Sequence, residues 1–194
     1  AQPGDHGEHY GTSIRINSLG LRDREIPAEP ATGERRILVM GDSVPYGIGV
    51  EYEESIPHQL EIIANEHAPD GVQFRTINMG IPSYNTQQEL IQLKSLGLPL
   101  QPQLVVLMFA KNDIEPKMWV FDKRSSWIAN FAQRSYAASL LFVLQRNMRQ
   151  KATGKSNVIN FGAFRQEHPR WKVIDESMSE INWLCHEAGI PFVL

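Results

Sequence analysis

The sequence lacks several features that would direct its interpretation elsewhere. It has one cysteine, Cys185, so it can form no intrachain disulfide and no metal site built on cysteines. Its longest uninterrupted apolar runs, 104–110 and 140–144, are far shorter than the roughly 20 residues that a membrane-spanning helix needs. It also has no internal repeat and no low-complexity tract. We therefore expect no disulfide scaffold and no membrane span within these residues.

The charge of the chain is small and mixed along its length. Its 194 residues include 19 Lys and Arg against 22 Asp and Glu, a formal net charge of −3. A nucleic-acid-binding surface needs clustered basic residues, so we expect no nucleic-acid partner. With 42% hydrophobic residues, the chain has the size and composition of one globular domain with its own core.

Both ends of the sequence suggest a longer polypeptide. It begins Ala1-Gln2-Pro3 without an initiating methionine, and residues 190–194 at its end are typical of a strand. We therefore expect further residues on both sides. A signal peptide or anchoring helix in the preceding segment would make the protein extracytoplasmic or membrane-anchored, and this is the location that we expect.

The chain divides into an arm and a main domain. Residues 1–35 are rich in glycine, proline and charge, with a short alternating piece at 13–17, and predict an N-terminal arm packed on the domain formed by 36–194. In that domain, strands are predicted at 37–40, 74–79, 104–110 and 192–194. Helical segments alternate with them, which predicts right-handed crossovers and the α/β class with a parallel sheet.

Four helical segments are predicted. The first begins near Ser55 and places Ile56, Leu60 and Ile63 on the face toward the sheet. The second runs from about Asn85 to Leu96, where Gly97 is a plausible stop. Segment 125–150 contains one or two helices. The last, 171–188, has a predicted buried stripe of Ile174, Met178, Ile181, Leu184 and Cys185.

The first three predicted strands end in polar or glycine residues. They lead into Gly41-Asp42-Ser43, Asn78-Met79-Gly80 and Lys111-Asn112-Asp113. In a parallel sheet these carboxyl ends lie at one edge, where open α/β proteins bind ligands. The first tripeptide alone would equally fit an ordinary Asx or Ser turn, so the prediction rests on all three ends.

These ends supply the groups that acyl transfer needs. A serine oxygen attacks the carbonyl carbon, and hydrogen-bond donors stabilise the oxyanion that develops. We predict Ser43 as the nucleophile. Its own N–H, the N–H of Gly80 and the side-chain amide of Asn112 are the predicted donors.

The same residues resemble the sequence blocks of the SGNH or GDSL hydrolase superfamily. Val39–Ser43 matches the first block, Asn78–Gly80 with 84–89 matches the second, and Asn112-Asp113 matches the third. Residues 16–22 and 51–61 are similar to a bacterial subgroup, so the resemblance covers 14–194. It implies a flavodoxin-like three-layer α/β/α sandwich and a serine esterase that works through an acyl-serine intermediate. We expect no cofactor and no metal.

The sequence departs from the family pattern at two places. Ala110-Lys111 stands before Asn112 where the family usually has glycine, a change that keeps the donor. The family's general base is a histidine in an Asp-x-x-His block, and these residues contain no such block. None of the six histidines has that setting; His168 is the best local substitute, and surface positions are expected for His58, His67 and His186.

A serine hydroxyl without an adjacent base is a poor nucleophile. We therefore expect residues 1–194 alone to be nearly inactive, and we expect the histidine block, and with it the catalytic His and Asp, to lie after Leu194.

Other candidates have simpler explanations. Gly41, Gly47 and Gly49 fit neither nucleotide-binding glycine pattern, and residues 41–45 do not form G-x-S-x-G. Asp42 is interpreted as a turn-stabilising carboxylate, not as a triad acid. Asp113 and Glu115 are interpreted as solvated loop residues, not as a metal pair.

An aromatic cluster follows the third strand end and lies within 115–150, the segment expected to control substrate choice. It would form either core or the wall of an acyl or sugar pocket. Its members are Trp119, Phe121, Trp127, Phe131 and Tyr136.

Three functions stay open at this point. The leading hypothesis is a serine esterase acting on a small-molecule or carbohydrate ester. The second is a carbohydrate O-acetyltransferase of the same fold, in which an acceptor hydroxyl replaces water. The third is a non-catalytic α/β binding or scaffold domain, since fold alone does not decide function.

Overall fold

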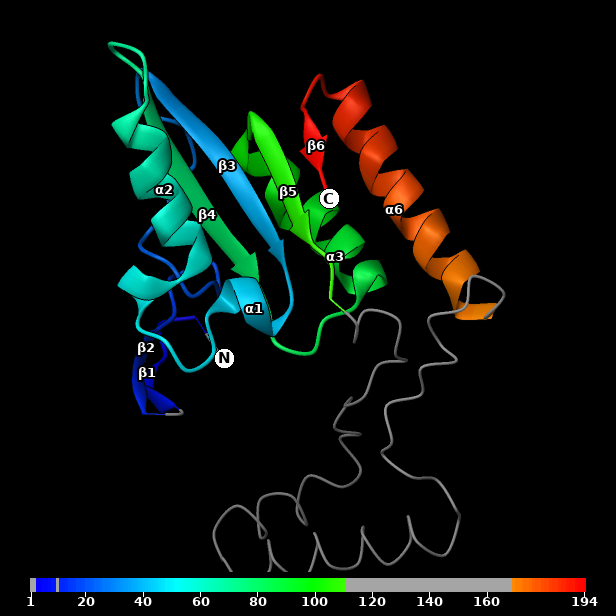
Figure 1. The fold of residues 1–194 in the computed structure, drawn as a ribbon, viewed down its shortest axis with the longest axis horizontal. Coiled ribbons are helices and arrows are strands. Elements are labelled where there is room, and N and C mark those ends of the chain that lie inside the picture. Colours follow the sequence, from blue (N-terminus) through cyan, green and yellow to red (C-terminus); the bar gives the residue numbers. More distant parts are fainter. Residues whose placement is uncertain (1–2, 10, 111–168) are drawn as a thin grey trace, which may run out of the picture. The chain divides into compact units, whose positions relative to one another are not determined.

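The computed structural model describes residues 3–9, 11–110 and 169–194 (Figure 1). Its strands are β1 (His6–His9), β2 (Thr12–Arg15), β3 (Glu34–Gly41), β4 (Gln73–Gly80), β5 (Leu104–Met108) and β6 (Phe192–Val193). Its α-helices are α1 (Ser43–Tyr46), α2 (Ile56–Glu66), α3 (Thr86–Gln92) and α6 (Pro169–Glu187). Three short segments complete the set: the 3-10 turns η1 (Tyr52–Glu54) and η3 (Leu98–Leu100), and the π-helical η2 (Leu93–Gly97). No helix in the described ranges is long and apolar enough to cross a membrane.

A four-stranded parallel sheet forms the centre of the structure. Its strand order is β4-β3-β5-β6, and every neighbouring pair is parallel. This confirms the α/β class and the parallel sheet predicted from the alternation of strands and helices. The third predicted strand is shorter than expected, because β5 ends at Met108 and not at Ala110.

Helices cover both faces of the sheet (Figure 1). On one face, Leu38 and Met79 point toward η2, where the backbone of Gly97 lies close to both side chains. On the other face, the Thr76 hydroxyl donates to the Pro57 carbonyl of α2 over 2.6 Å. Residues of β3, β4, β5, α3 and α6 share one buried apolar cluster. The layers are therefore α2, sheet, and α3 with α6, as the three-layer sandwich predicts.

The prediction for α2 was right in position and wrong in its buried face. The helix begins after Ser55 as expected, but Ile56 and Ile63 are 45% and 55% exposed. Polar side chains face the sheet instead: Glu61 accepts from the N–H of Thr76, and Asn65 accepts from the N–H of Phe74, both over 2.9 Å. The helix flanks an edge strand, whose unpaired N–H groups need acceptors more than they need apolar cover.

Gly97 does not end the second predicted helix. Its φ is −66°, and the chain continues helically through η3 to Leu100. A Cβ at position 97 would lie 3.0 Å from the Leu38 and Leu93 methyl groups. The glycine is therefore explained by close packing of η2 on the sheet, and not by a left-handed stop.

The final helix matches its predicted stripe. Ile174, Ile181 and Cys185 are buried in α6, and Met178 and Leu184 are partly buried. Burial raises the pKa of the Cys185 thiol. The cysteine is a core residue, as its place in the predicted stripe indicated.

The N-terminal residues are integrated into the packing. Strands β1 and β2 form an antiparallel hairpin, and Leu21 and Ile26 belong to the same buried cluster as the sheet. The boundary at residue 35 stays a prediction.

The burial of Cys185 predicts slow thiol chemistry in the folded protein. We expect a thiol reagent to modify native protein at least ~100-fold more slowly than protein in denaturing urea, because the thiol is covered and its pKa is raised. Absorbance of the released chromophore measures the rate, and Cys185→Ser gives the blank. Comparable rates in both conditions would contradict the packing of α6.

Candidate active site

The structure brings the ends of β3, β4 and β5 together. Gly41 at the end of β3 is in register with Gly80 at the end of β4 and with Met108 at the end of β5. The three strand ends therefore lie at one edge of the sheet, as parallel pairing requires. Asn112, the third predicted site residue, lies outside the described residues, as do His168 and the aromatic cluster.

The turn after β3 places Ser43 at the start of the single-turn helix α1. Gly41 has φ +143°, and a Cβ there would lie 2.8 Å from the Met108 carbonyl oxygen, so both conformation and space require glycine. Asp42 caps the turn: its Oδ1 accepts from the N–H of Val44 over 3.1 Å. This confirms the interpretation of Asp42 as a turn-stabilising carboxylate.

Ser43 is accessible at this turn. Its side chain is partly exposed, and its hydroxyl donates to Asp42 Oδ2 over 3.1 Å. Its backbone N–H has no acceptor within the described part of the chain, as is normal in the first turn of a helix. The serine therefore offers both an oxygen and an N–H donor at the sheet edge.

Gly80 meets a packing constraint that the sequence did not indicate. A Cβ there would lie 2.3 Å from the Tyr46 nitrogen and 2.8 Å from the Pro45 carbonyl carbon, so glycine alone lets α1 pack on β4. Its N–H donates to the Asn78 side-chain oxygen over 3.0 Å. Its role as an oxyanion donor stays a prediction, and that role requires the bond to Asn78 to open.

The loop after β4 contains a strained serine that sequence reasoning missed. The N–H of Tyr84 donates to the Ile81 carbonyl over 3.1 Å, which closes a turn around Pro82 and Ser83. Ser83 has φ +68°, the left-handed value that position i+2 of a type II turn needs and that glycine usually supplies. The N–H of Ser83 also has no acceptor among the described residues. Proline at position i+1 was the available signal for this turn.

A buried arginine holds the loop after α1. The Arg22 guanidinium donates to the carbonyls of Tyr46, Gly47 and Val50, and to the Ser13 carbonyl of the hairpin. It also lies over the Tyr46 ring, 5.5 Å from its centroid. Arg22 is 2% exposed, so its buried charge is stabilised by these backbone carbonyl groups and holds them in place. The sequence pattern of 16–22 includes Arg22 but does not indicate this role.

The next residue, Asp23, forms hydrogen bonds with β4 and with Tyr52. Its carboxylate accepts from the N–H of Asn78 over 2.7 Å and from the Tyr52 hydroxyl over 2.9 Å. Burial raises the pKa of Asp23 although these bonds act to lower it. Burial and the neighbouring Asp23 charge raise the pKa of Tyr52.

No histidine contacts Ser43 within the described ranges. His67 and His186 are exposed, as predicted. His58 is partly buried, with its ring centroid 4.9 Å from that of Tyr52, so its expected surface position was only half right.

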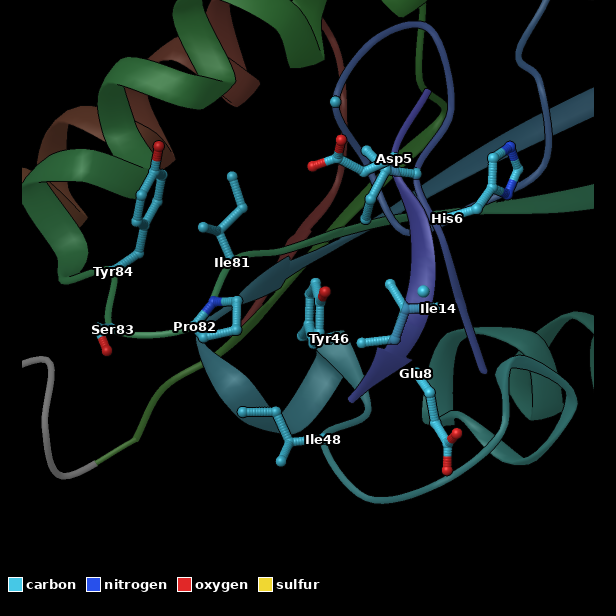
Figure 2. Close-up of a pocket in the computed structure, with 13 residues that line it drawn as sticks. Asp5, His6, Glu8, Ile14, Tyr46, Ile48, Ile81, Pro82, Ser83 and Tyr84 are labelled. Carbon is cyan, nitrogen blue, oxygen red and sulfur yellow. The ribbon is translucent and has the colours of Figure 1, made fainter. Parts of the chain in front are cut away.

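A cavity of about 810 Å³ opens at the same edge of the sheet. Its walls come from the β1–β2 hairpin, from the end of α1 and from the turn at 81–84 (Figure 2). Tyr46, the last residue of the helix that begins at Ser43, lines it, so the cavity starts about one helical turn from the serine.

Several solved structures are similar to this chain at low sequence identity. One is AlinE4, an SGNH-hydrolase family esterase, with 22% identity over 82% of this chain and 75% of that chain, at a TM-score of 0.37. Another is Axe2, an acetylxylan esterase from Geobacillus stearothermophilus, with 15% identity over the same shares and a TM-score of 0.38. A GDSL-like lipase from Bacteroides thetaiotaomicron has 18% identity over 81% and 67%, at 0.31.

No family model matches the sequence, and no curated protein matches it. At these identities and TM-scores the likeness to solved structures assigns no role to any residue. The roles of individual residues rest on the geometry described above.

The packing of Gly80 predicts a large loss of stability on adding one methyl group. We expect Gly80→Ala to lower the free energy of unfolding by about 3 kcal/mol, because the new Cβ meets backbone atoms that cannot rotate away. Urea denaturation measures it. Gly7→Ala is the matched control, since its Cβ would meet nothing within 4 Å; an equal effect of both changes would contradict the close approach of α1 to β4.

The raised pKa of Asp23 predicts a pH-dependent stability. The Asp23 carboxyl contributes most to the free energy of unfolding below its ordinary pKa of 3.8. This contribution falls as pH rises through the higher pKa of the folded state. Between pH 4 and neutrality, the free energy of unfolding of wild type should therefore fall relative to that of Asp23→Asn. The expected fall is about 1.4 kcal/mol for each unit by which folding raises the pKa. Urea midpoints at each pH measure this, with exposed Asp70→Asn as control. A wild-type advantage that grows with pH would reverse the sign and refute it.

Proposed function

We propose that this chain forms the core of a serine ester hydrolase of the SGNH type, with Ser43 as the nucleophile. One observation carries the proposal: the chain places an accessible serine at the carboxyl edge of a parallel sheet, in a turn that glycine and a capping aspartate fix, beside a cavity. Ligands of open α/β sheets bind at this edge.

The reaction then proceeds in two steps, acylation of Ser43 and hydrolysis of the acyl-serine. Ser43 Oγ adds to the ester carbonyl carbon while its proton passes to a base, and the carbon–oxygen bond to the alcohol breaks as the alcohol takes up a proton. Water next adds to the acyl-serine and releases the carboxylic acid and the serine hydroxyl. Both steps pass through a tetrahedral oxyanion, which backbone N–H donors stabilise.

The described residues supply two N–H groups without acceptors at this edge, those of Ser43 and Ser83. Neither group has to break a hydrogen bond within the described residues before it can donate to an oxyanion. Gly80 joins them only after its bond to Asn78 opens, and Asn112 remains the proposed side-chain donor. Losing one such donor typically costs about 3 to 4 kcal/mol of transition-state stabilisation.

The base is the part of the site that the described residues do not provide. The Ser43 hydroxyl donates to Asp42, and no described histidine reaches it. We therefore propose that catalysis needs a histidine from residues outside the described ranges, and that residues 1–194 alone hydrolyse esters slowly.

Labelling with a fluorophosphonate tests the nucleophile. In the full natural protein, we expect the probe to label wild type, because it captures an activated serine oxygen, and to leave Ser43→Ala unlabelled, a loss of at least about 100-fold. In-gel fluorescence and intact mass measure the adduct.

Ser83→Ala is the matched control, since it removes the other serine hydroxyl of the same edge and keeps its backbone N–H. It should label like wild type. Equal labelling of Ser43→Ala and wild type, or loss of label in Ser83→Ala alone, would show that Ser43 is not the nucleophile.

A further inference from the structure

The loop between α2 and β4 contains a dipeptide whose side chain and backbone can react with each other. Asp70-Gly71 is the only Asp-Gly pair in the sequence, which has no Asn-Gly pair. In an Asp-Gly pair the nitrogen of the glycine is open to attack on the aspartate side chain, because glycine has no Cβ to crowd it. The local structure decides whether this reaction occurs in the folded protein.

The structure leaves both reacting groups free. Asp70 and Gly71 are exposed, and the Asp70 carboxylate has no ion pair or hydrogen bond with any described residue. The Gly71 N–H likewise has no acceptor in the described part of the chain. A Cβ at Gly71 would meet nothing within 4 Å, so the space around the dipeptide is open. A bond between the two groups therefore breaks no contact of the fold.

The turn that contains the dipeptide is closed by one backbone hydrogen bond. The N–H of Val72 donates to the Pro69 carbonyl over 3.0 Å, and Gly71 has φ +76°. This is a type II turn with glycine at position i+2. Exposed loops with few contacts open locally at a small cost in free energy. The Asp70 side chain can therefore reach the Gly71 nitrogen without unfolding of the domain.

The other described aspartates lack this freedom. Asp23 and Asp42 use their carboxylates to accept from backbone N–H groups. Asp175 lies within helix α6, and Asp5 is followed by a histidine. Among the aspartates that the structure describes, Asp70 alone combines an unpaired carboxylate, an exposed turn and a following glycine.

We propose that Asp70-Gly71 is a site of spontaneous covalent modification, at which aspartate converts to isoaspartate through a cyclic imide. The Gly71 nitrogen bonds to Asp70 Cγ, and the carboxyl OH leaves as water with the N–H proton. Water then adds to one of the two carbonyl carbons of the five-membered ring. Opening at Cγ restores aspartate, whereas opening at the backbone carbonyl leaves the chain running through Cγ.

This conversion needs no partner molecule except water. One water leaves when the ring closes, and one is taken up when the ring opens. The inference is independent of the proposed function, because neither step uses Ser43 or a substrate.

Isoaspartate lengthens the backbone by one methylene beside a close contact. The Gly71 carbonyl oxygen packs against Gly33, where a Cβ would lie only 2.3 Å from it. The Gly33 carbonyl accepts from the N–H of Gln73 over 3.0 Å, next to the register pair Glu34 and Gln73 that begins β3–β4 pairing. The modification therefore loosens the start of this strand pair, at the end opposite to the edge that holds Ser43.

Peptide mapping by mass spectrometry tests the modification. The folded protein and a reference peptide of residues 67–73 are incubated at neutral pH in heavy-oxygen water, so that each ring opening incorporates a heavy oxygen. Fragmentation at N–Cα bonds then distinguishes isoaspartate from aspartate. We expect isoaspartate at Asp70 to form within about fivefold of the peptide's rate, because the loop opens at small cost, and none to form at Asp42.

Two variants tie the product to this dipeptide. Asp70→Glu keeps the charge and should form no product during the experiment, because its side chain is one methylene too long for the five-membered ring. Asp70→Asn should convert faster than wild type, because ammonia leaves from a neutral amide, whereas a carboxylate must first gain a proton.

Amide hydrogen exchange tests the effect on the sheet. In wild type that has converted, exchange at the Gln73 N–H should accelerate, because its acceptor Gly33 is displaced. The Val105 N–H, which donates to the Pro191 carbonyl at the other side of the sheet, is the reference that should not change.

The absence of isoaspartate at Asp70 once half of the reference peptide has converted would overturn the proposal. Equal amounts of product in wild type and in Asp70→Glu would overturn it as well. Product that forms without faster exchange at Gln73 would support the modification site and reject its effect on β3–β4 pairing.

Discussion

The outer edge of β4 is the constraint on which much of the structure depends. Strand β4 pairs on one side with β3, and its other side presents a row of N–H groups that need acceptors. The N–H groups of residues 74, 76, 78 and 80 are taken in turn by the side chains of Asn65, Glu61, Asp23 and Asn78. Four side chains thus satisfy one edge. They also fix α2 and the N-terminal segment against it.

This arrangement makes the N-terminal segment part of the site. Asp23 satisfies the strand edge, and the adjacent Arg22 holds the loop that follows the serine turn. Two neighbouring residues therefore link β4, α1 and the hairpin through buried hydrogen bonds. Four carbonyl acceptors compensate the buried charge of Arg22, whereas the desolvation of Asp23 outweighs its hydrogen bonds and raises its pKa. Both side chains set backbone positions around the cavity.

Much of the fold follows from hydrophobic pattern, because buried strands and the stripe of α6 are made of apolar residues at regular spacing. The face of α2 could not be predicted in this way, since Glu61 and Asn65 turn inward to serve an edge strand and reverse the usual pattern. The site also has a part that the sequence predicts and a part that it does not. The ends of the predicted strands indicated Ser43 and Gly80. The bond from Gly80 to Asn78 and the left-handed conformation of Ser83 depend on backbone geometry that residue types do not reveal.

The Arg22 guanidinium contacts carbonyl oxygens from segments that lie up to 28 residues away in the chain. Opening any one of these segments exposes the same buried charge, so each opening carries nearly the full cost of all of them. The hairpin and the loop at residues 46–50 therefore form one cooperative unit of local unfolding. A ligand that stabilises the hairpin therefore also slows amide hydrogen exchange at residues 46–50, whose carbonyl groups share the same guanidinium.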